Sequence, residues 1–220
     1  MWSDVNMGGA MAKKRGTYHH GDLRRALLDG ALAMVTEHGG TGAVTLREIA
    51  RRAGVSHSAP YRHFKDKGAI LAALAAEGFA ELAHSLRAAR VGVEPPEQRF
   101  IETGLAYLRF VHANPGLITV MFGPGVTKNR TPELQRLAND AFQVLKDLAT
   151  DAGVVELGEA RRLGTVAWSF LHGLSILTMQ KQVPPSVGAA PEDLATLGLR
   201  QLFASFREPA VRASSAATPG

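Results

Sequence analysis

The chain has 220 residues, of which 45% are hydrophobic and none is cysteine, and its formal net charge is +5. This length accommodates one small domain and one of ordinary size. The lack of cysteine excludes a disulfide framework and a thiolate metal site, and it suits the reducing cytoplasm. No apolar run approaches the ~20 residues that cross a bilayer, so no membrane partner is expected.

The first 17 residues carry a basic run and no apolar segment of signal-peptide length. We interpret residues 1–17 as a flexible basic extension. Its Lys13, Lys14 and Arg15 could reach the minor groove or the phosphates of DNA, as short basic arms beside DNA-binding helices do. The alternative is a solvated tail that binds nothing.

Residues 45–64, TLREIARRAGVSHSAPYRHF, have the pattern of two short helices joined by a tight turn. Thr45 followed by Glu48 forms a T-x-x-E capping box, after which apolar residues recur at helical period. Gly54 stands where a helix stop needs a left-handed residue, and Ser56 is the next N-cap. This order is typical of a helix-turn-helix, although an ordinary helical hairpin shares part of it.

The second of these helices is expected to begin at His57 and to lie in the major groove of DNA. Pro60 would fall in its first turn, where a missing N–H costs least. The side chains expected to face outward are His57, Ser58, Tyr61, Arg62 and His63. Phe64 should point inward, and the alternative for Tyr61 is that it helps to close the head's core.

Positive charge gathers around this helix pair. Residues 13–67 hold 11 basic and 5 acidic side chains, a net charge of +6, so all the excess positive charge of the chain lies there. Asp66 can cap a long following helix, and Lys67 would then sit in its first turn, where free N–H groups favour an anion. The pattern therefore predicts a phosphate contact at Lys67, within a patch whose affinity for DNA falls with salt.

The periodic segments are helical throughout, so the sequence predicts an all-α fold of about nine helices. A three-helix, helix-turn-helix DNA-binding head would carry a larger helical domain for ligand binding and dimerisation. The expected domains are the extension (1–17), the head (18–66), a connecting helix (67–90), an effector-binding and dimerisation domain (91–208) and a flexible tail (209–220). The expected helices span roughly 22–38, 67–89, 97–113, 132–152, 158–180 and 191–207, with the helix pair at 45–64 and a short helix from 114.

Four groups of residues carry a resemblance to a known family. They are the run from Tyr18 to Arg24, the segment 45–50 after Glu37-His38-Gly39, the turn Gly54-Val55-Ser56, and the run from Tyr61 to Lys67. Together they resemble the N-terminal domain of TetR-type transcriptional regulators over about residues 18–85. Trp168, His172 and Gly173 resemble the Trp…His-Gly (WHG) signature of one C-terminal subgroup of that family.

The resemblance implies a role for each matching position in the head. His57, Ser58 and Ala59 would face base edges, while Tyr61 and His63 would touch phosphate or sugar. The remaining expected DNA contacts are Thr45, Arg47, Arg62 and Lys67. No catalytic residue, cofactor or metal is implied, and the partner is double-stranded operator DNA.

The resemblance also implies that the larger domain forms a homodimer through its last two helices. Apolar side chains of the last helix would contribute to that interface, unless they belong to the protomer's own core: Leu194, Leu197, Leu202, Phe203 and Phe206. A two-fold dimer presents its two recognition helices about 34–36 Å apart, which predicts a near-palindromic operator.

The second implied role of the larger domain is to sense a small-molecule effector. Aromatic and methionine side chains on facing helices can line an apolar cavity. The candidates are Tyr107, Phe110, Met121, Phe122, Phe142, Trp168 and His172. The alternative for each is ordinary core packing, and His172 is expected to bind a buried carbonyl. An effector that favours one geometry of the dimer would change operator affinity by 5- to 150-fold. Repression is the expected mode.

Two other classes of protein were weighed. An enzyme would carry reactive-site motifs, but the sequence has no G-x-S-x-G elbow, no phosphate-binding G-x-x-x-x-G-K-[ST] loop and no H-E-x-x-H helix. A helical protein-binding adaptor without DNA binding is the other alternative. The basic helix pair favours the regulator over both.

Overall fold

The computed structural model describes residues 20–151 and 157–216, and in this part all regular secondary structure is helical. The α-helices are α1 (His20–His38), α2 (Leu46–Arg52), α3 (Lys67–Ala88), α4 (Pro96–Ala113), α5 (Pro115–Met121), α6 (Pro124–Lys128), α7 (Pro132–Asp151), α8 (Leu157–Met179) and α9 (Pro191–Ala216). Two 3-10 helices, η1 (Ala59–Arg62) and η2 (Pro185–Val187), complete the order. The predicted all-α class is confirmed.

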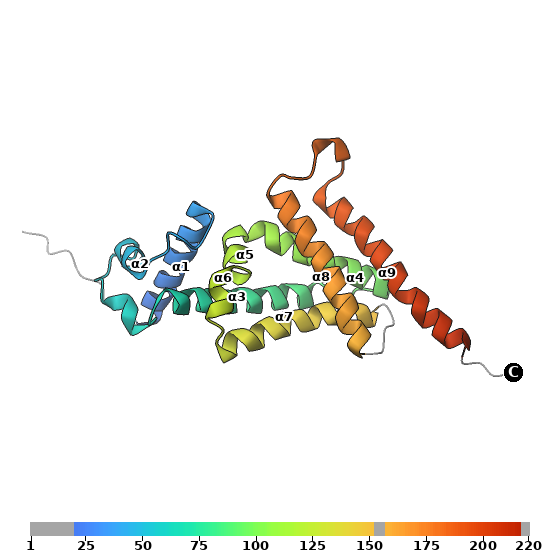
Figure 1. The fold of residues 1–220 in the computed structure, drawn as a ribbon, viewed down its shortest axis with the longest axis horizontal. Helices are drawn as coiled ribbons and strands as arrows, with labels where there is room; N and C mark the ends of the chain where they lie inside the picture. Colours follow the sequence, from blue (N-terminus) through green and yellow to red (C-terminus); the bar gives the residue numbers. More distant parts are fainter. Residues whose placement is uncertain (1–19, 152–156, 217–220) are drawn as a thin grey trace, which may run out of the picture.

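The head and the larger domain share one long element. α1, α2 and η1 lie at one end of the molecule, and α3 begins among them and runs into the larger domain (Figure 1). There α7 lies along α3, and α8 and α9 cross over α4 on the side away from the head (Figure 1). α3 therefore runs from the head into the larger domain.

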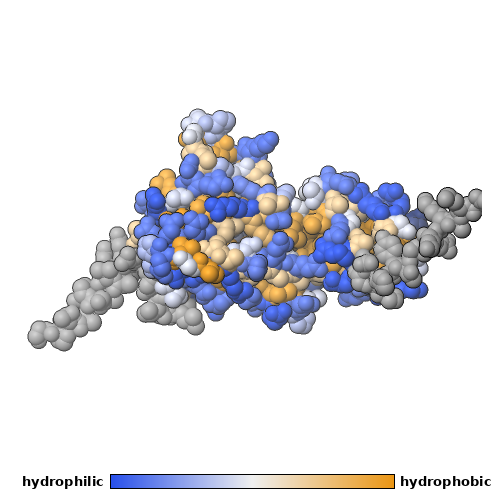
Figure 2. Space-filling view, turned by 180° about the vertical axis from the view of Figure 1, so that it is seen from behind, coloured by the Kyte–Doolittle hydropathy of each residue, from blue (hydrophilic) through white to orange (hydrophobic). Residues whose placement is uncertain are grey.

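The core is continuous from the head into the larger domain. In the head it contains Leu27, Leu28, Ile49 and Phe64, all nearly inaccessible to solvent. Apolar residues at helical spacing along α3 and α4 are buried: Ile70, Leu71, Leu74, Phe79, Leu82, Leu86, Phe100, Ile101, Leu105, Leu108 and Val111. On the outside, hydrophilic side chains predominate, and apolar ones reach the surface toward the middle of the face shown in Figure 2.

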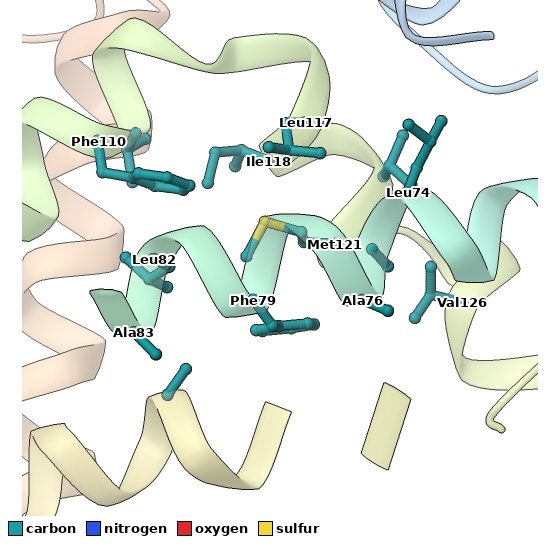
Figure 3. Close-up of a cluster of buried hydrophobic side chains, with 14 of the residues drawn as sticks. Leu74, Ala76, Phe79, Leu82, Ala83, Phe110, Leu117, Ile118, Met121 and Val126 are labelled. Carbon is teal, nitrogen blue, oxygen red and sulfur yellow. The ribbon is translucent and has the colours of Figure 1, made fainter. Parts of the chain in front are cut away.

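α3 is the central helix of this core. By length and composition α3 is apolar enough to cross a membrane. The expectation that the chain has no such apolar run was wrong here, because many residues of α3 are alanine. Most of that stretch is buried inside the protein. Figure 3 shows Phe79 and Ala83 on the side of α3 toward α7, and Leu117, Ile118 and Met121 of α5 on the opposite side. Burial on both sides accounts for the composition of α3 without a bilayer.

Two boundaries differ from those predicted. α9 continues to Ala216, past residue 207, and the added stretch contains three alanines, the best helix former. Directly after α5, Pro124 opens a further short helix, α6, where none was predicted. Proline is well suited to that first helical position, where its missing N–H would have no partner.

Candidate functional site

The turn after α2 follows the predicted pattern, with one change in the cap. Thr45 Oγ1 accepts a hydrogen bond from the backbone N–H of Glu48 at 3.2 Å, and Gly54 has a φ of +66°. The Glu48 carboxylate does not complete the capping box. It accepts hydrogen bonds from Arg51 at 2.8 and 2.6 Å, a bidentate contact stronger than one to a backbone N–H. The bond from Arg51 lowers the pKa of Glu48 to about 2.

The second helix of the pair is shorter than predicted. It begins at Ala59 rather than His57, and it is a single 3-10 turn. The Ser56 carbonyl would pair with residue 60 in an α-helix, but Pro60 has no N–H to donate. That carbonyl instead accepts from Ala59 at 3.0 Å, and His63 and Phe64 both donate to the Pro60 carbonyl. Proline therefore fixes the i→i+3 pattern.

The 3-10 geometry decides which side chains face outward. Residues three apart eclipse one another in such a helix, so His63 follows Pro60 toward the interior. His63 is half-buried, and its Nε2 is buried with no hydrogen-bond partner in the described structure. This differs from the exposure expected for His63. Tyr61 has 60% of its surface exposed, which excludes the alternative that it closes the head's core.

The other head residues predicted to contact DNA are exposed, apart from Ala59 and Lys67, which are half-buried. The exposed ones are Thr45, Arg47, His57, Ser58 and Arg62. Lys13, Lys14 and Arg15 lie outside the described residues. Lys67 donates from Nζ to the Gly42 carbonyl at 3.1 Å, and Asp66 caps α3 by accepting from the Ala69 N–H at 2.8 Å. The ammonium of Lys67 keeps two further donors.

Ion pairs divide the cations of the head into two sets. Arg51 and Arg52 are paired with Glu48 and Glu37, and on α1 Arg25 is paired with Glu77 of α3 at 2.8 Å. Among the described residues of the head, three exposed cations have no carboxylate partner: Arg47, Arg62 and Lys65. Sequence reasoning missed Lys65, which only the ion-pair pattern singles out. These three side chains and Tyr61 are free to meet an anionic surface.

The larger domain contains a cavity of about 370 Å³ between α3, α5, α7 and α8. Met121, Phe122, Phe142 and Trp168, four of the predicted effector residues, line it together with Phe79, Val126, Leu134 and Ala138. Its remaining lining residues are polar: Arg130, Gln135 and Asn139. Sequence reasoning missed these three because nothing in the local pattern separates Arg130, just before α7, or Gln135 and Asn139 of α7 from ordinary solvated residues.

Tyr107, Phe110 and His172 do not line this cavity. Phe110 is a core side chain, and Tyr107 and His172 form a hydrogen-bonded group behind Trp168. The Tyr107 hydroxyl lies 2.8 Å from His172 Nδ1 and accepts from the Trp168 indole N–H at 3.2 Å. The partner of His172 is therefore a phenol rather than the expected carbonyl. Burial raises the pKa of Tyr107 and lowers the pKa of His172.

One face of α8 and α9 carries apolar side chains that the protomer does not cover. Val166 and Leu177 are 48% and 45% exposed, and Leu197 is 60% exposed. A Cβ at Gly173 would meet nothing within 4 Å, so this glycine does not serve a helix approach within the described protomer. Of the residues expected at a dimer interface, Leu194 and Leu202 are half-buried, Phe203 packs against Phe100 in the core, and the side chain of Phe206 lies outside the described part.

Comparison with known proteins agrees with this arrangement. Residues 27–74 match the family described as "Bacterial regulatory proteins, tetR family", and residues 100–202 match "Tetracyclin repressor-like, C-terminal domain". The HTH-type transcriptional regulator BetI of Rhizobium meliloti (strain 1021) is 28% identical over 182 residues, which are 80% of this chain and 89% of BetI.

Solved structures share the fold over most of the chain. A protein of unknown function from Rhodococcus sp. RHA1 is 31% identical with a TM-score of 0.73, over 86% of this chain and 98% of that one. The fatty acid degradation regulator FadR from Bacillus halodurans is 16% identical with a TM-score of 0.65, over 84% and 96%, a likeness of fold alone. The family and the named relatives are transcriptional regulators rather than enzymes. The chain belongs to the tetR family of bacterial regulatory proteins and is a DNA-binding transcriptional regulator.

Proposed function

We propose that this regulator is a homodimeric repressor that acts in the cytoplasm, binds a near-palindromic operator and releases it when a small-molecule effector enters the cavity. The observation that carries the DNA contact is the face of the head around η1. Tyr61 is displayed to solvent there, and Arg47, Arg62 and Lys65 have no carboxylate partner among the described residues of the head. Cations without an internal partner are what phosphate contacts require.

The uncovered face of α8 and α9 supports the homodimer. Val166, Gly173 and Leu177 follow one another at helical spacing, so they share one side of α8, and Leu197 adds an exposed leucine on α9. Large apolar side chains grouped in this way favour a protein contact over water. The open space at Gly173 suits close approach by a second copy of the helix.

The position of α5 supports a link between cavity and head. Met121 at its end and the following Phe122 line the cavity, while Gly116 near its start packs on Thr36 of α1. An effector that shifts Met121 would therefore press on the head directly, in addition to acting through α3. Such coupling changes operator affinity because the effector binds one geometry better than the other.

The proposal includes membership of the Trp…His-Gly subgroup, whose signature Trp168, His172 and Gly173 resemble. Trp168 lines the cavity and His172 stacks on its ring, with the ring centroids 5.5 Å apart. This pair would therefore respond to a bound effector even though only Trp168 reaches the cavity.

The test is a gel shift with the intergenic DNA beside the regulator's own gene. We expect retention that weakens steeply with added salt and is lost on Tyr61→Ala or Lys67→Ala. Arg109→Ala, which removes an exposed arginine of α4 far from the head, should leave retention unchanged. No retention at low salt by the folded protein would overturn the proposal.

A further inference from the structure

The apolar part of the cavity is built for a flat or chain-like apolar group. Phe122 and Trp168 lie 6.0 Å apart between ring centroids, and Phe142 meets Trp168 edge-on at 5.0 Å. Phe79 packs edge-on to Phe122 at 5.7 Å. The volume of about 370 Å³ lies in the range of small-molecule sites.

The polar part of the cavity has more hydrogen-bond donors than its own side-chain oxygens use. Arg130 Nη1 donates to Gln135 Oε1 at 2.9 Å, and Gln135 Nε2 donates to Asn139 Oδ1 at 2.8 Å. Each side-chain oxygen of this chain of contacts therefore already holds a donor. The N–H groups of Arg130 Nε and Nη2 and of Asn139 Nδ2 have no partner in the described structure. Arg130 and Asn139 are exposed, so an acceptor on a bound molecule would replace water at these donors.

The described charged side chains that line this cavity and the neighbouring one are all cations. Among its described lining residues, Arg130 is the only charged side chain. A neighbouring cavity of about 460 Å³ shares Asn139 and Phe142 with it, and the charged side chains lining that one, Lys146 and Arg161, are also cations. The potential at the polar end is therefore positive, which favours an anion.

We infer that the effector is an amphipathic organic acid. Its apolar body would lie among Phe122, Phe142 and Trp168, and its carboxylate would accept hydrogen bonds from Arg130 and Asn139. This inference rests on the proposed function, because it specifies the molecule that fills the same cavity. The competing chemistry is an organic cation held by the aromatic rings. The described lining offers that cation no carboxylate and faces it with Arg130.

Three probes with one apolar body separate these chemistries: 4-phenylbutanoate, 4-phenylbutanamide and 4-phenylbutylamine. The chain has two tryptophans, so Trp2→Phe leaves Trp168 in the cavity wall as the sole reporter of binding by fluorescence. We expect the acid to bind about five- to tenfold tighter than the amide, and the amine to bind most weakly. Tightest binding by the amine, or no binding of any probe at millimolar concentration, would overturn the inference.

Substitutions test the residues that hold the carboxylate. Arg130→Gln should reduce the preference for acid over amide to near unity, and Asn139→Asp should reverse the preference. Arg136→Gln removes an exposed arginine of α7, the helix that carries Asn139, and Arg136 does not line the cavity, so this variant should keep the preference. Acid preference retained in Arg130→Gln and Asn139→Asp would refute the inference.

Operator release is measured separately, by gel shift with and without the acid. If the acid binds through Arg130 but operator retention does not weaken, the chemistry inferred for the cavity stands and the proposed release of the operator is wrong. Release by the amine, or by the amide alone, supports effector control and refutes the inference.

Discussion

Gly116 of α5 packs so closely against Thr36 of α1 that a Cβ on Gly116 would overlap the Thr36 hydroxyl. That hydroxyl also donates to the Leu32 carbonyl at 3.0 Å, which holds it in place. Residue 116 lies near the end of α5 opposite Met121 in the cavity wall. The contact therefore joins the larger domain to the head through α5.

Gly116→Ala should lower the free energy of unfolding by about 1–3 kcal/mol, since overpacking at a tight contact costs that much. Thr36→Ala in the same chain should recover most of the loss because it deletes the overlapping hydroxyl. Urea denaturation of the two single variants and the double variant measures the coupling.

Gly125→Ala is the matched control for this contact. Gly125 also follows a proline at the start of a short helix, but its added Cβ would lie 3.6 Å from Leu71 Cδ1, an ordinary contact. We expect a change in the free energy of unfolding of less than about 1 kcal/mol for Gly125→Ala. Equal effects of the two substitutions would show that the Thr36 contact is loose.

Tyr107→Phe should destabilise the larger domain without leaving a large cavity. The lost hydroxyl bonds both His172 Nδ1 and the Trp168 N–H, and both partners would remain at least partly buried. Leaving such groups unpaired costs about 1–3 kcal/mol. Chemical denaturation gives the loss, and Trp168 fluorescence should change at the same time; Tyr18→Phe, outside the described residues, serves as the spectroscopic control.

Protonation of His172 should weaken the fold as the pH falls. Burial lowers the pKa of His172 in the folded state, so the unfolded chain binds a proton more readily. Stability therefore rises with pH through the region below the unfolded pKa of about 6.5 and falls on acidification through it. The melting temperature between pH 7.5 and 5.5 should decline less steeply in His172→Gln than in the parent. Parallel declines would contradict this assignment.

Arg47→Ala and Tyr61→Phe should affect operator binding differently. Removing a phosphate contact reduces the slope of log affinity against log salt by about 1, and Arg47 has a charge to lose whereas Tyr61 does not. We therefore expect a shallower salt dependence for Arg47→Ala and an unchanged slope for Tyr61→Phe. Titrations at several salt concentrations provide the measurement, with Arg109→Ala as the reference for a distant charge.

Leu177→Arg and Leu197→Arg should convert the proposed dimer into monomers, because each places a charge in an interface built from exposed apolar side chains. Light scattering gives the mass of the particle in solution. Val91→Arg is the matched control, since Val91 is 80% exposed but lies beyond α3 rather than on the α8 and α9 face. If both leucine variants remain dimers, the dimer interface does not include this face of α8 and α9.

Local patterns in the sequence were sufficient for most of the fold. Helical periodicity and proline positions predicted α3, α4 and α7 to within one or two residues, since each buries an apolar stripe and a proline opens α4 and α7. The cap at Thr45 and the turn at Gly54 are equally local. What these patterns share is that the cause and the structure lie within a few residues of each other.

The features that the sequence did not predict have two kinds of cause. Arg51 turns Glu48 away from the capping box, and Pro60 turns the expected α-helix into η1, so two of the differences have local causes that compete with the pattern. The division of the effector candidates has a different origin. Whether Phe142 or Tyr107 reaches the cavity depends on how α4, α7 and α8 pack, which periodicity does not specify.

The shortness of η1 sets how much a single head can discriminate. Four residues place few side chains on base edges, and each good base contact is worth about 1–3 kcal/mol. Two such contacts give about 2–6 kcal/mol, whereas singling out one address among ~10⁶ genomic competitors needs about 8 kcal/mol. In the proposed dimer, selectivity would depend on the two heads together and on the distance between them, so a rearrangement that leaves each head intact would be enough to abolish it.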